Sequence, residues 1–289
     1  MRFTSHTSLT AYLNEHIHPE FSLGFVPTMG ALHQGHLSLM RTALEHCSHL
    51  VVSIFVNPTQ FDNKQDLEKY PRDLDADVQL LQQHFNDQSL IIYHPNVEDV
   101  YGQRPEAKKY DFDGLDLVME GANRPGHFDG VGTILEFFFN VIRPDKAFFG
   151  EKDFQQLQII RKLVDQLPQN IEIVGCPIER ETHGLAMSSR NERLTVAARK
   201  EAGFIYKSLR IAADHFRANN ITSTLEMVKE LYNEQPNLDL EYAVIADEST
   251  LQPASSTSPN ASYRLFVVAH LEGVRLIDNI PLSKQQSSN

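Results

Sequence analysis

The chain has 289 residues, of which 41% are hydrophobic and 22% charged, and a formal net charge of −12 at pH 7. This composition is ordinary for a folded protein with a sizeable core, and the negative charge argues against a nucleic-acid partner, whose phosphates it would repel. No apolar run approaches the roughly 18 to 20 residues of a membrane span, and residues 1–20 lack the apolar core of a signal peptide. Cys47 and Cys176 both lie in or beside apolar runs and are expected in the core, which fits a reducing, cytoplasmic compartment.

Helices and strands are expected to alternate over the first 176 residues. Apolar periodicity predicts helices over 8–17, 36–47, 73–85, 132–142 and 154–167, and strands over 22–29, 49–56, 90–93, 146–149 and 171–176. Residues 96–129, rich in Gly, Pro and charge, are expected to form one long irregular stretch. The alternation predicts an α/β fold, a Rossmann-like parallel sheet with helices on both faces.

The pattern changes after residue 176. One long helix is expected over 195–216 and a second over 222–232, followed by strands over 240–245, 263–271 and 276–280. Helices followed by antiparallel-looking strands predict a smaller C-terminal α+β domain. The expected division is therefore a domain of residues 1–176 and a domain of residues 177–289.

The most informative segment joins the strand predicted at 22–29 to the next helix. It contains His33, Gly35 and His36 after a turn at Gly30. Ligands bind at the carboxyl ends of parallel strands, and a helix N-terminus there offers free N–H groups and partial positive charge to an anion. Two imidazoles three residues apart add hydrogen-bond donors on one face. The segment therefore predicts a phosphate site.

Other readings of the two histidines stay open at this point. A zinc site would usually space them four apart with a Glu between, and the sequence offers no obvious third ligand. They could also be surface or capping residues with no further role. A dinucleotide-binding loop fits poorly because the G-x-G-x-x-G spacing is missing.

A second polar loop, residues 184–191, contains Met187, Ser188, Ser189 and Arg190. Two hydroxyls and a guanidinium suit a polyphosphate, although Gly and Ser are equally typical of an interdomain linker. The pairing of His-x-Gly-His with Met-Ser-Ser-Arg resembles the nucleotidyl-transferring superfamily that includes class I aminoacyl-tRNA synthetases. In that superfamily the two signatures hold a triphosphate from opposite sides.

Four longer strings narrow the resemblance. They begin at Val51 (VVSIFVNPTQF), Tyr70 (YPR), Arg124 (RPGHFDGV) and Phe149 (FGEKDFQQL). Together with the two signatures, which extend the matches from Pro27 to Asn191, they resemble the pantothenate synthetase family. The last hundred residues resemble that family only in length and character.

The resemblance implies a two-step reaction and a set of partners. Pantoate attacks the α-phosphate of ATP to give pantoyl-adenylate and pyrophosphate, and the amine of β-alanine then displaces AMP. Mg²⁺ is expected on the phosphates, with no metal-ligating side chains assigned. The family also implies that the first domain binds ATP and pantoate, that the second forms a lid carrying the Ser-Ser-Arg loop at its start, and that the protein is a homodimer.

Site residues are implied in the same way. Catalytic roles fall to His36, His33, Lys152 and Arg190, with His36 the favoured proton donor. ATP-binding residues are Met29, Gly30, His33, Gly35, His36, Gly150, Lys152, Asp153, Met187, Ser188, Ser189 and Arg190. Pantoate or β-alanine would be bound by Gln60, Gln156, Asn57 and Arg124, the last by ordering a loop over pantoate. Without the resemblance, Gln60 would be interpreted as an ordinary loop amide and Arg124 as a solvated surface cation.

Acidic residues at two places need a separate interpretation. Glu179 stands near the expected adenine contact, where many relatives have a small or apolar residue. Asp73, Asp75 and Asp77 could hold a metal, but Ala76 interrupts the cluster, and we expect a solvated helix face.

Two rival functions remain. Another nucleotidyltransferase of the superfamily, such as a cytidylyl- or adenylyltransferase, would have His-x-Gly-His but lack the Asn-Pro-Thr-Gln and Gly-Glu-Lys-Asp strings. A non-catalytic nucleotide-binding protein would not need every phosphate contact retained. ATP–pyrophosphate exchange that depends on pantoate distinguishes the main interpretation from both.

Overall fold

The computed structural model describes residues 1–61, 67–68, 70–85 and 89–283. The chain divides into two units, the first comprising Met1–Glu151 and Gln155–Pro177 and the second comprising Lys152–Phe154 and Ile178–Asn289. The sequence predicts a division between residues 176 and 177, one residue before the observed division between Pro177 and Ile178. The assignment of Lys152–Phe154 to the second unit was not expected from the sequence.

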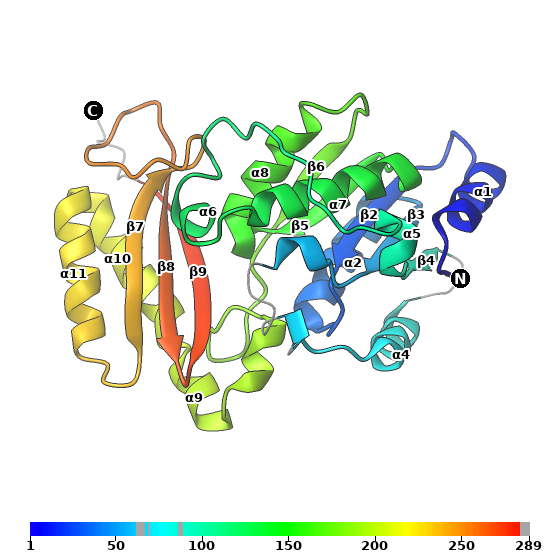
Figure 1. Ribbon diagram of the computed structural model, residues 1–289. Helices are drawn as coiled ribbons and strands as arrows, with labels where there is room; N and C mark the ends of the chain where they lie inside the picture. The colour runs from blue at the N-terminus through cyan, green and yellow to red at the C-terminus, as the bar shows by residue number, and fades with distance from the viewer. Residues whose placement is uncertain (62–66, 69, 86–88, 284–289) are drawn as a thin grey trace. The chain divides into compact units, whose positions relative to one another are not determined.

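A six-stranded parallel sheet in the order β1-β4-β3-β2-β5-β6 forms the centre of the first unit (Figure 1). Its strands are β1 (Arg2–Phe3), β2 (Leu23–Thr28), β3 (His49–Ile54), β4 (Leu90–Tyr93), β5 (Lys146–Gly150) and β6 (Glu172–Cys176). Its helices are α1 (His6–His16), α2 (Gln34–His46), α4 (Leu74–His84), α5 (Val97–Tyr101), α6 (Met119–Asn123), α7 (His127–Ile142) and α8 (Phe154–Val164). Two 3₁₀ turns, η1 (Pro58–Gln60) and η2 (Glu151–Asp153), follow β3 and β5.

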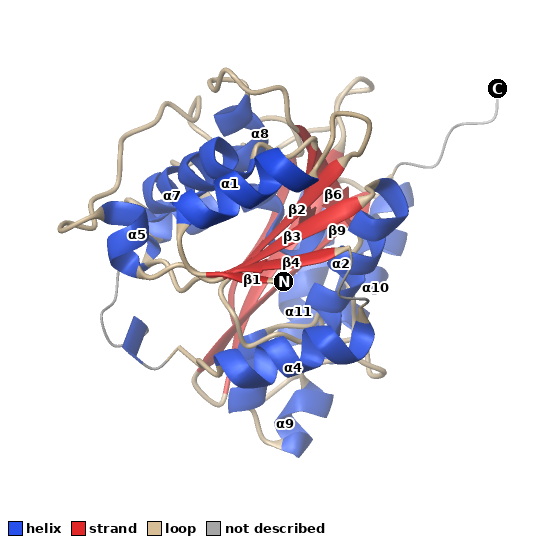
Figure 2. Ribbon diagram, turned by 90° about the vertical axis from the view of Figure 1, so that its right-hand side faces the viewer, coloured by secondary structure: helices blue, strands red, loops and turns tan. Residues whose placement is uncertain are grey.

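Neighbouring residues of β2 show that helices cover both faces of this sheet. Successive side chains of a strand point to opposite faces, and Phe25 packs against Phe138 and Phe139 of α7. Val26 belongs instead to a buried cluster that includes residues of α2 and α4. Figure 2 shows α1 and α7 on one side of the strands and α2 and α4 on the other. The predicted α/β architecture is therefore confirmed, and both cysteines are buried within the first unit.

The second unit is an antiparallel sheet covered by helices on one face. The sheet contains β7 (Asp239–Asp247), β8 (Tyr263–Leu271) and β9 (Val274–Leu282). The helical elements are η3 (Ser189–Arg193), α9 (Val196–Glu201), α10 (Phe204–Ala218) and α11 (Ile221–Asn233). Apolar side chains of α10 and α11 share one core with alternate residues of the strands. This is the predicted smaller α+β arrangement (Figure 1).

The helix predicted over 195–216 is wrong as a single element, because α9 ends and α10 begins around Gly203. A Cβ atom at this position would lie 2.3 Å from the carbonyl oxygen of His183. Only glycine permits such an approach of another backbone segment, so a tertiary contact interrupts the helical pattern.

The stretch 96–129 is also more regular than predicted. It contains α5 and α6, and α7 begins at His127, five residues before the expected start at 132. Glycines at 130 and 132 weaken the local helical signal, while eleven residues of α7 are buried. Packing therefore extends the helix beyond what propensity indicates. No described helix is long and apolar enough to cross a membrane.

Candidate active site

The loop after β2 lies at the point where the strand order of the sheet reverses. Successive strands β2, β3 and β4 are added on one side, whereas β5 and β6 lie on the other. Such a switch point leaves a crevice at the carboxyl ends of the two central strands. Gly30 adopts φ +83° there, and the hydroxyl of Thr28 accepts a hydrogen bond from the Gly30 N–H at 3.3 Å while donating to the Ser53 carbonyl.

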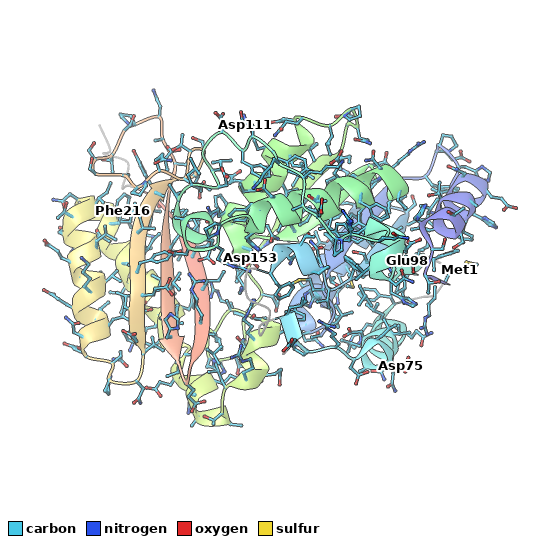
Figure 3. All side chains as sticks on the ribbon, viewed as in Figure 1. Met1, Asp75, Glu98, Asp111, Asp153 and Phe216 are labelled. Atoms are coloured by element: carbon cyan, nitrogen blue, oxygen red, sulfur yellow. The ribbon has the colours of Figure 1, made fainter. Side chains whose placement is uncertain are left out.

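Asp77 holds this loop, and the expectation that its whole acidic cluster is a solvated helix face is wrong for this residue. Its side chain is 5% exposed, and its two carboxylate oxygens accept hydrogen bonds from the N–H groups of Ala31 (3.0 Å) and Leu32 (2.7 Å). Burial raises the pKa of Asp77, although these two N–H groups lower it. Asp73 instead caps α4, and Asp75 is exposed and points away from the sheet (Figure 3).

His33 and His36 form the first turn of α2, and their hydrogen bonds fix which ring nitrogen carries the proton. Nδ1 of His33 accepts from the N–H of Gly35 (3.1 Å), and Nδ1 of His36 accepts from the N–H of His33 (3.2 Å). A neutral imidazole that accepts at Nδ1 carries its hydrogen on Nε2. The rings lie 4.0 Å apart between centroids. Both half-buried histidines therefore carry their hydrogen on Nε2 when neutral, at a helix N-terminus, and each uses Nδ1 to accept from the main chain.

Gln60 and Asn57 connect the loop after β3 to the loop after β2. The Gln60 amide nitrogen donates to the thioether sulfur of Met29. Asn57 is only 1% exposed; its nitrogen donates to Gln60 Oε1 (3.2 Å) and the Gly130 carbonyl (3.0 Å), and its oxygen accepts from the Tyr101 hydroxyl. In this geometry Asn57 holds Gln60, and a direct contact of Asn57 with substrate stays a prediction.

Arg124 and His127 hold the main chain of Gln60. The Arg124 guanidinium donates to the Gln60 carbonyl at 3.3 Å, and Nδ1 of His127 lies 2.7 Å from the same oxygen. Arg124 also donates to Nε2 of His127 (3.1 Å), so the ring carries its proton on Nδ1 and donates it to that carbonyl. The sequence analysis assigned His127 no role; its place three residues after Arg124 in the quoted string was the available signal.

Gln156, the other predicted pantoate ligand, lies half-buried in the first turn of α8. Its neighbour Gln155 is 4% exposed and is used structurally. The Gln155 amide donates to the carbonyls of Leu115 and Val118, both at 2.8 Å, and accepts from the N–H of Glu120. Thus Gln155 orders the loop before α6, and the pantoate contact of Gln156 stays a prediction.

In the second unit, Lys152 and Asp153 belong to the short turn η2, which follows Gly150 at the end of β5. The Lys152 ammonium lies 3.6 Å from an Asp153 carboxylate oxygen. The Lys152 carbonyl accepts a hydrogen bond from the Asn279 side chain at 2.9 Å. Asp153 is exposed and is labelled in Figure 3. The main chain at the predicted phosphate-binding lysine is therefore fixed by a strand far along the sequence.

The Met-Ser-Ser-Arg loop begins where a small hairpin ends. Arg180 and Ala186 form an antiparallel bridge, and the N–H of Met187 donates to the carbonyl of Glu179 at 2.9 Å. Ser188 caps η3 by accepting from the Arg190 N–H (3.3 Å), and Ser189 and Arg190 begin that 3₁₀ turn. Glu179 uses its backbone in this contact and leaves its side chain exposed.

An ion pair between the partly buried Arg180 and the buried Asp278 supports the hairpin. Arg180 binds both carboxylate oxygens of Asp278, at 2.5 and 2.9 Å, and also donates to the Gly184 carbonyl at 3.1 Å. Its guanidinium lies 3.7 Å above the Tyr206 ring. Burial raises the pKa of Asp278, while the Arg180 guanidinium counteracts that rise. Neither residue was singled out from the sequence.

The predicted residues thus fall into two sets, each ordered within its own unit. The first unit groups Met29, Gly30, His33, Gly35, His36, Asn57, Gln60 and Arg124 around the loops after β2 and β3, with Gly150 and Gln156 at β5 and α8. The second unit holds Lys152, Asp153, Met187, Ser188, Ser189 and Arg190. In the described part of the chain, no group of three or more His, Cys, Asp or Glu side chains is arranged to bind a metal ion.

The chain is similar in sequence to known proteins over most of its length. A family profile described as pantoate-beta-alanine ligase matches residues 2–281. A pantothenate synthetase of Christiangramia forsetii is 52% identical over 262 residues, covering 91% of this chain and 92% of the relative. The pantothenate synthetase of Flavobacterium psychrophilum is 48% identical over 280 residues, covering 97% of this chain and 99% of that protein.

Solved structures are similar over the whole chain as well. A pantothenate synthetase from Thermus thermophilus superposes with a TM-score of 0.87 at 37% identity, covering 97% of this chain and 99% of the other. A pantoate-beta-alanine ligase from Francisella tularensis, in complex with beta-gamma ATP and beta-alanine, gives a TM-score of 0.78 at 31% identity and covers 97% of both chains.

Proposed function

Because this chain belongs to the pantoate–β-alanine ligase family, we infer that it joins pantoate to β-alanine at the expense of ATP. It is an ATP-dependent ligase that forms an amide bond. A carboxylate is a poor electrophile, since its leaving group would be oxide. The pantoate carboxylate therefore first attacks the α-phosphorus of ATP, and pyrophosphate leaves with the electron pair of the broken P–O bond. The β-alanine amine then attacks the acyl-adenylate carbonyl, AMP leaves, and the amine proton goes to solvent.

The observation that carries this function is the pair of Nε2–H donors of His33 and His36. In the adenylation transition state, negative charge grows on the phosphate oxygens. Donors that are already oriented stabilise this charge without reorganisation, and the N-terminus of α2 adds its partial positive charge. We assign both histidines to charge stabilisation on the phosphates. A proton transfer from His36 is a secondary role, because pyrophosphate bound to Mg²⁺ hardly needs one.

The second unit supplies cations in this proposal. Lys152 and Arg190 would offset phosphate charge, and the hydroxyls of Ser188 and Ser189 would donate to phosphate oxygens. Met29 and Met187 would pack on adenine or the pantoate methyls, and Asp153 would bind the ribose or orient the lysine. The support for these roles is the family resemblance, together with the hydrogen bonds that hold η2 and the Met-Ser-Ser-Arg loop.

Gln60 and Gln156 are proposed to bind pantoate. A neutral amide donates to a carboxylate without holding it in a strong ion pair, so the carboxylate remains nucleophilic. Gln60 now donates to a thioether, which is a weak acceptor, and a pantoate oxygen would be a better one. Arg124 and His127 keep the Gln60 backbone in place during that exchange. Asn57 would contact β-alanine or pantoate, or act through Gln60.

Mg²⁺ is proposed to enter with ATP. In nucleotide-dependent enzymes this ion is usually held by phosphate oxygens and several waters, with one or two carboxylates. A homodimer in the cytoplasm is likewise a proposal supported by the resemblance, and the mass of the protein in solution, measured by light scattering, tests the dimer.

Isotope exchange between pyrophosphate and ATP tests the proposed function directly. We expect exchange only when pantoate is present, and pantothenate and AMP in equal amounts after β-alanine is added. His36→Ala should lower the exchange rate about 100-fold, since losing one preorganised donor costs roughly 3 kcal/mol. His46→Ala, at the exposed end of the same helix, is the matched control. Exchange without pantoate, or none at all, would overturn the assignment.

A further inference from the structure

Two adjacent residues of β9, Asp278 and Asn279, are polar and almost completely buried, at 4% and 2% exposed. They point to opposite faces of the C-terminal sheet. Asp278 pairs in register with Val267, which belongs to the core shared with α10 and α11, and Asn279 pairs with Phe266 on the other face. Burial of polar groups is costly unless they are hydrogen-bonded, so these two side chains need partners inside the protein.

Asn279 uses both ends of its amide. Its nitrogen donates to the Lys152 carbonyl at 2.9 Å, and its oxygen accepts from the Arg264 guanidinium at 2.6 Å. Arg264 is itself 5% exposed and donates to Glu248 at 2.7 Å. The amide therefore receives a hydrogen bond from a fixed cation and gives one to the lysine segment.

The same cation also contacts the lysine segment directly. The Arg264 guanidinium lies 3.9 Å above the ring of Phe154, and that ring also packs on Phe266. The segment Lys152–Phe154 is thus attached to the C-terminal sheet at a carbonyl and at an aromatic ring, two residues apart. These attachments explain why three residues in the middle of the chain belong to the second unit.

We propose that Asn279 is a positioning residue for adenylation, acting through the main chain of Lys152. This inference rests on the proposed role of Lys152 as a phosphate contact. The Lys152 side chain has four rotatable bonds. Fixing its backbone therefore fixes the position of the Cα atom from which the ammonium extends toward the phosphates. Small displacements of a positioned group lower rates by up to roughly 100-fold, so a hydrogen bond remote from the substrate can affect the chemical step.

Asparagine is the residue that this position requires. An aspartate of the same size would still accept from Arg264, but it cannot donate to the Lys152 carbonyl. Asn279→Asp therefore removes the hydrogen bond to the Lys152 carbonyl and retains the one from Arg264. Asn260→Asp makes the same chemical change in an exposed loop of the same unit and serves as the matched control.

The experiment measures both half-reactions of Asn279→Asp. We expect pantoate-dependent pyrophosphate exchange at saturating substrates to fall about 10- to 100-fold, with a smaller change in the KM for ATP. Aminolysis of separately prepared pantoyl-adenylate by β-alanine should change less than about twofold. In a Lys152→Ala background, Asn279→Asp should cause little further loss, because coupled residues are not additive.

Each outcome separates this inference from the proposed function. No pantoate-dependent exchange in the wild-type protein would refute the proposed function. If the wild-type protein does catalyse exchange, two results refute the positioning role alone. The first is an exchange rate of Asn279→Asp equal to that of Asn260→Asp. The second is a rate loss from Asn279→Asp that multiplies with the loss from Lys152→Ala. If Asn279→Asp does not fold by circular dichroism, Asn279→Ala replaces it, because it removes the donor without placing a carboxylate beside the carbonyl.

Discussion

Each unit contains a buried aspartate that holds a loop proposed to contact ATP, and the two do so in different ways. In the first unit, Asp77 binds two main-chain N–H groups of the His-x-Gly-His loop directly. In the second unit, Asp278 binds Arg180, and the arginine in turn holds the carbonyl of Gly184 in the hairpin before the Met-Ser-Ser-Arg loop.

This difference follows from what each loop needs. The tight turn after β2 leaves N–H groups unpaired, and a carboxylate satisfies two of them at once. The hairpin in the second unit presents a carbonyl, which requires a donor, and the arginine that supplies the donor brings a charge that must be balanced. Asp77 therefore acts mainly on loop geometry, whereas Asp278 also balances the charge of a partly buried arginine.

The largest effect is expected from Asp278→Asn. The substitution keeps the shape of the side chain but leaves the Arg180 guanidinium, which is 16% exposed, without its charged partner. Breaking a fully buried pair typically costs about 3–5 kcal/mol, which is the upper limit for this pair. Urea unfolding followed by far-UV circular dichroism measures the shift in the midpoint. Asp239→Asn, at the exposed start of β7, should leave the midpoint nearly unchanged. An equal midpoint for the two variants would show that the ion pair does not stabilise the second unit.

A smaller effect, on activity more than on stability, is expected from Asp77→Asn. An amide can accept from only one of the two loop N–H groups, and losing a charge-assisted hydrogen bond is worth roughly 1.5–3 kcal/mol. We expect pantoate-dependent exchange to fall about 10- to 100-fold. Asp75→Asn, on the exposed side of the same helix (Figure 3), is the control.

The stability effect of Asp77→Asn should be smaller than that of Asp278→Asn because the partners of Asp77 are two neutral N–H groups, so no cation loses its counter-ion. Burial also raises the pKa of Asp77, so the folded protein holds the proton more tightly than the unfolded chain does. Ionisation therefore costs folding free energy as pH rises through the folded pKa, and a neutral amide avoids that cost. A loss of stability in Asp77→Asn as large as that in Asp278→Asn would contradict the distinction between the two aspartates.

The smallest effect is expected where an acid–arginine pair lies near the surface. Glu241 on β7 accepts from Arg275 and from His270, and the hydrogen bond from Arg275 is the main cause that lowers the pKa of Glu241. Glu241→Gln should cost less than about 1 kcal/mol, because exposed pairs are screened by water. The pair stabilises the fold above the ordinary glutamate pKa of 4.5 and is lost as pH falls through the lowered value.

Thermal unfolding of the wild type and Glu241→Gln at several pH values checks this sign. The difference in midpoint should be constant near neutral pH and shrink below about pH 4.5. A difference that grows on acidification would mean that burial, and not the arginine, dominates at Glu241.

The regular elements and the phosphate-binding motifs could be read from the sequence because their signals are local. A nearly unbroken apolar run predicts β3, and the phosphate site is predicted from His33 and His36, which lie within one helical turn. The hydrogen bonds at Nδ1 of the two histidines come from the structure. Asp77 was misjudged although a local signal existed. It lies in the same helical stripe as Leu74, Val78 and Leu81, and an acid within an apolar stripe indicates a buried partner.

The sequence by itself determined the α/β character of the first unit, the chemistry of the loop after β2 and the family, since these depend on periodicity and on residues close along the chain. Tertiary structure alone decided that Asn279 supports Lys152 and that Asp278 pairs with Arg180, across 127 and 98 positions. It also decided that Gly203 divides a helix. Such contacts form only when distant backbone segments meet in a packed interior, and no local preference of the residues involved encodes them.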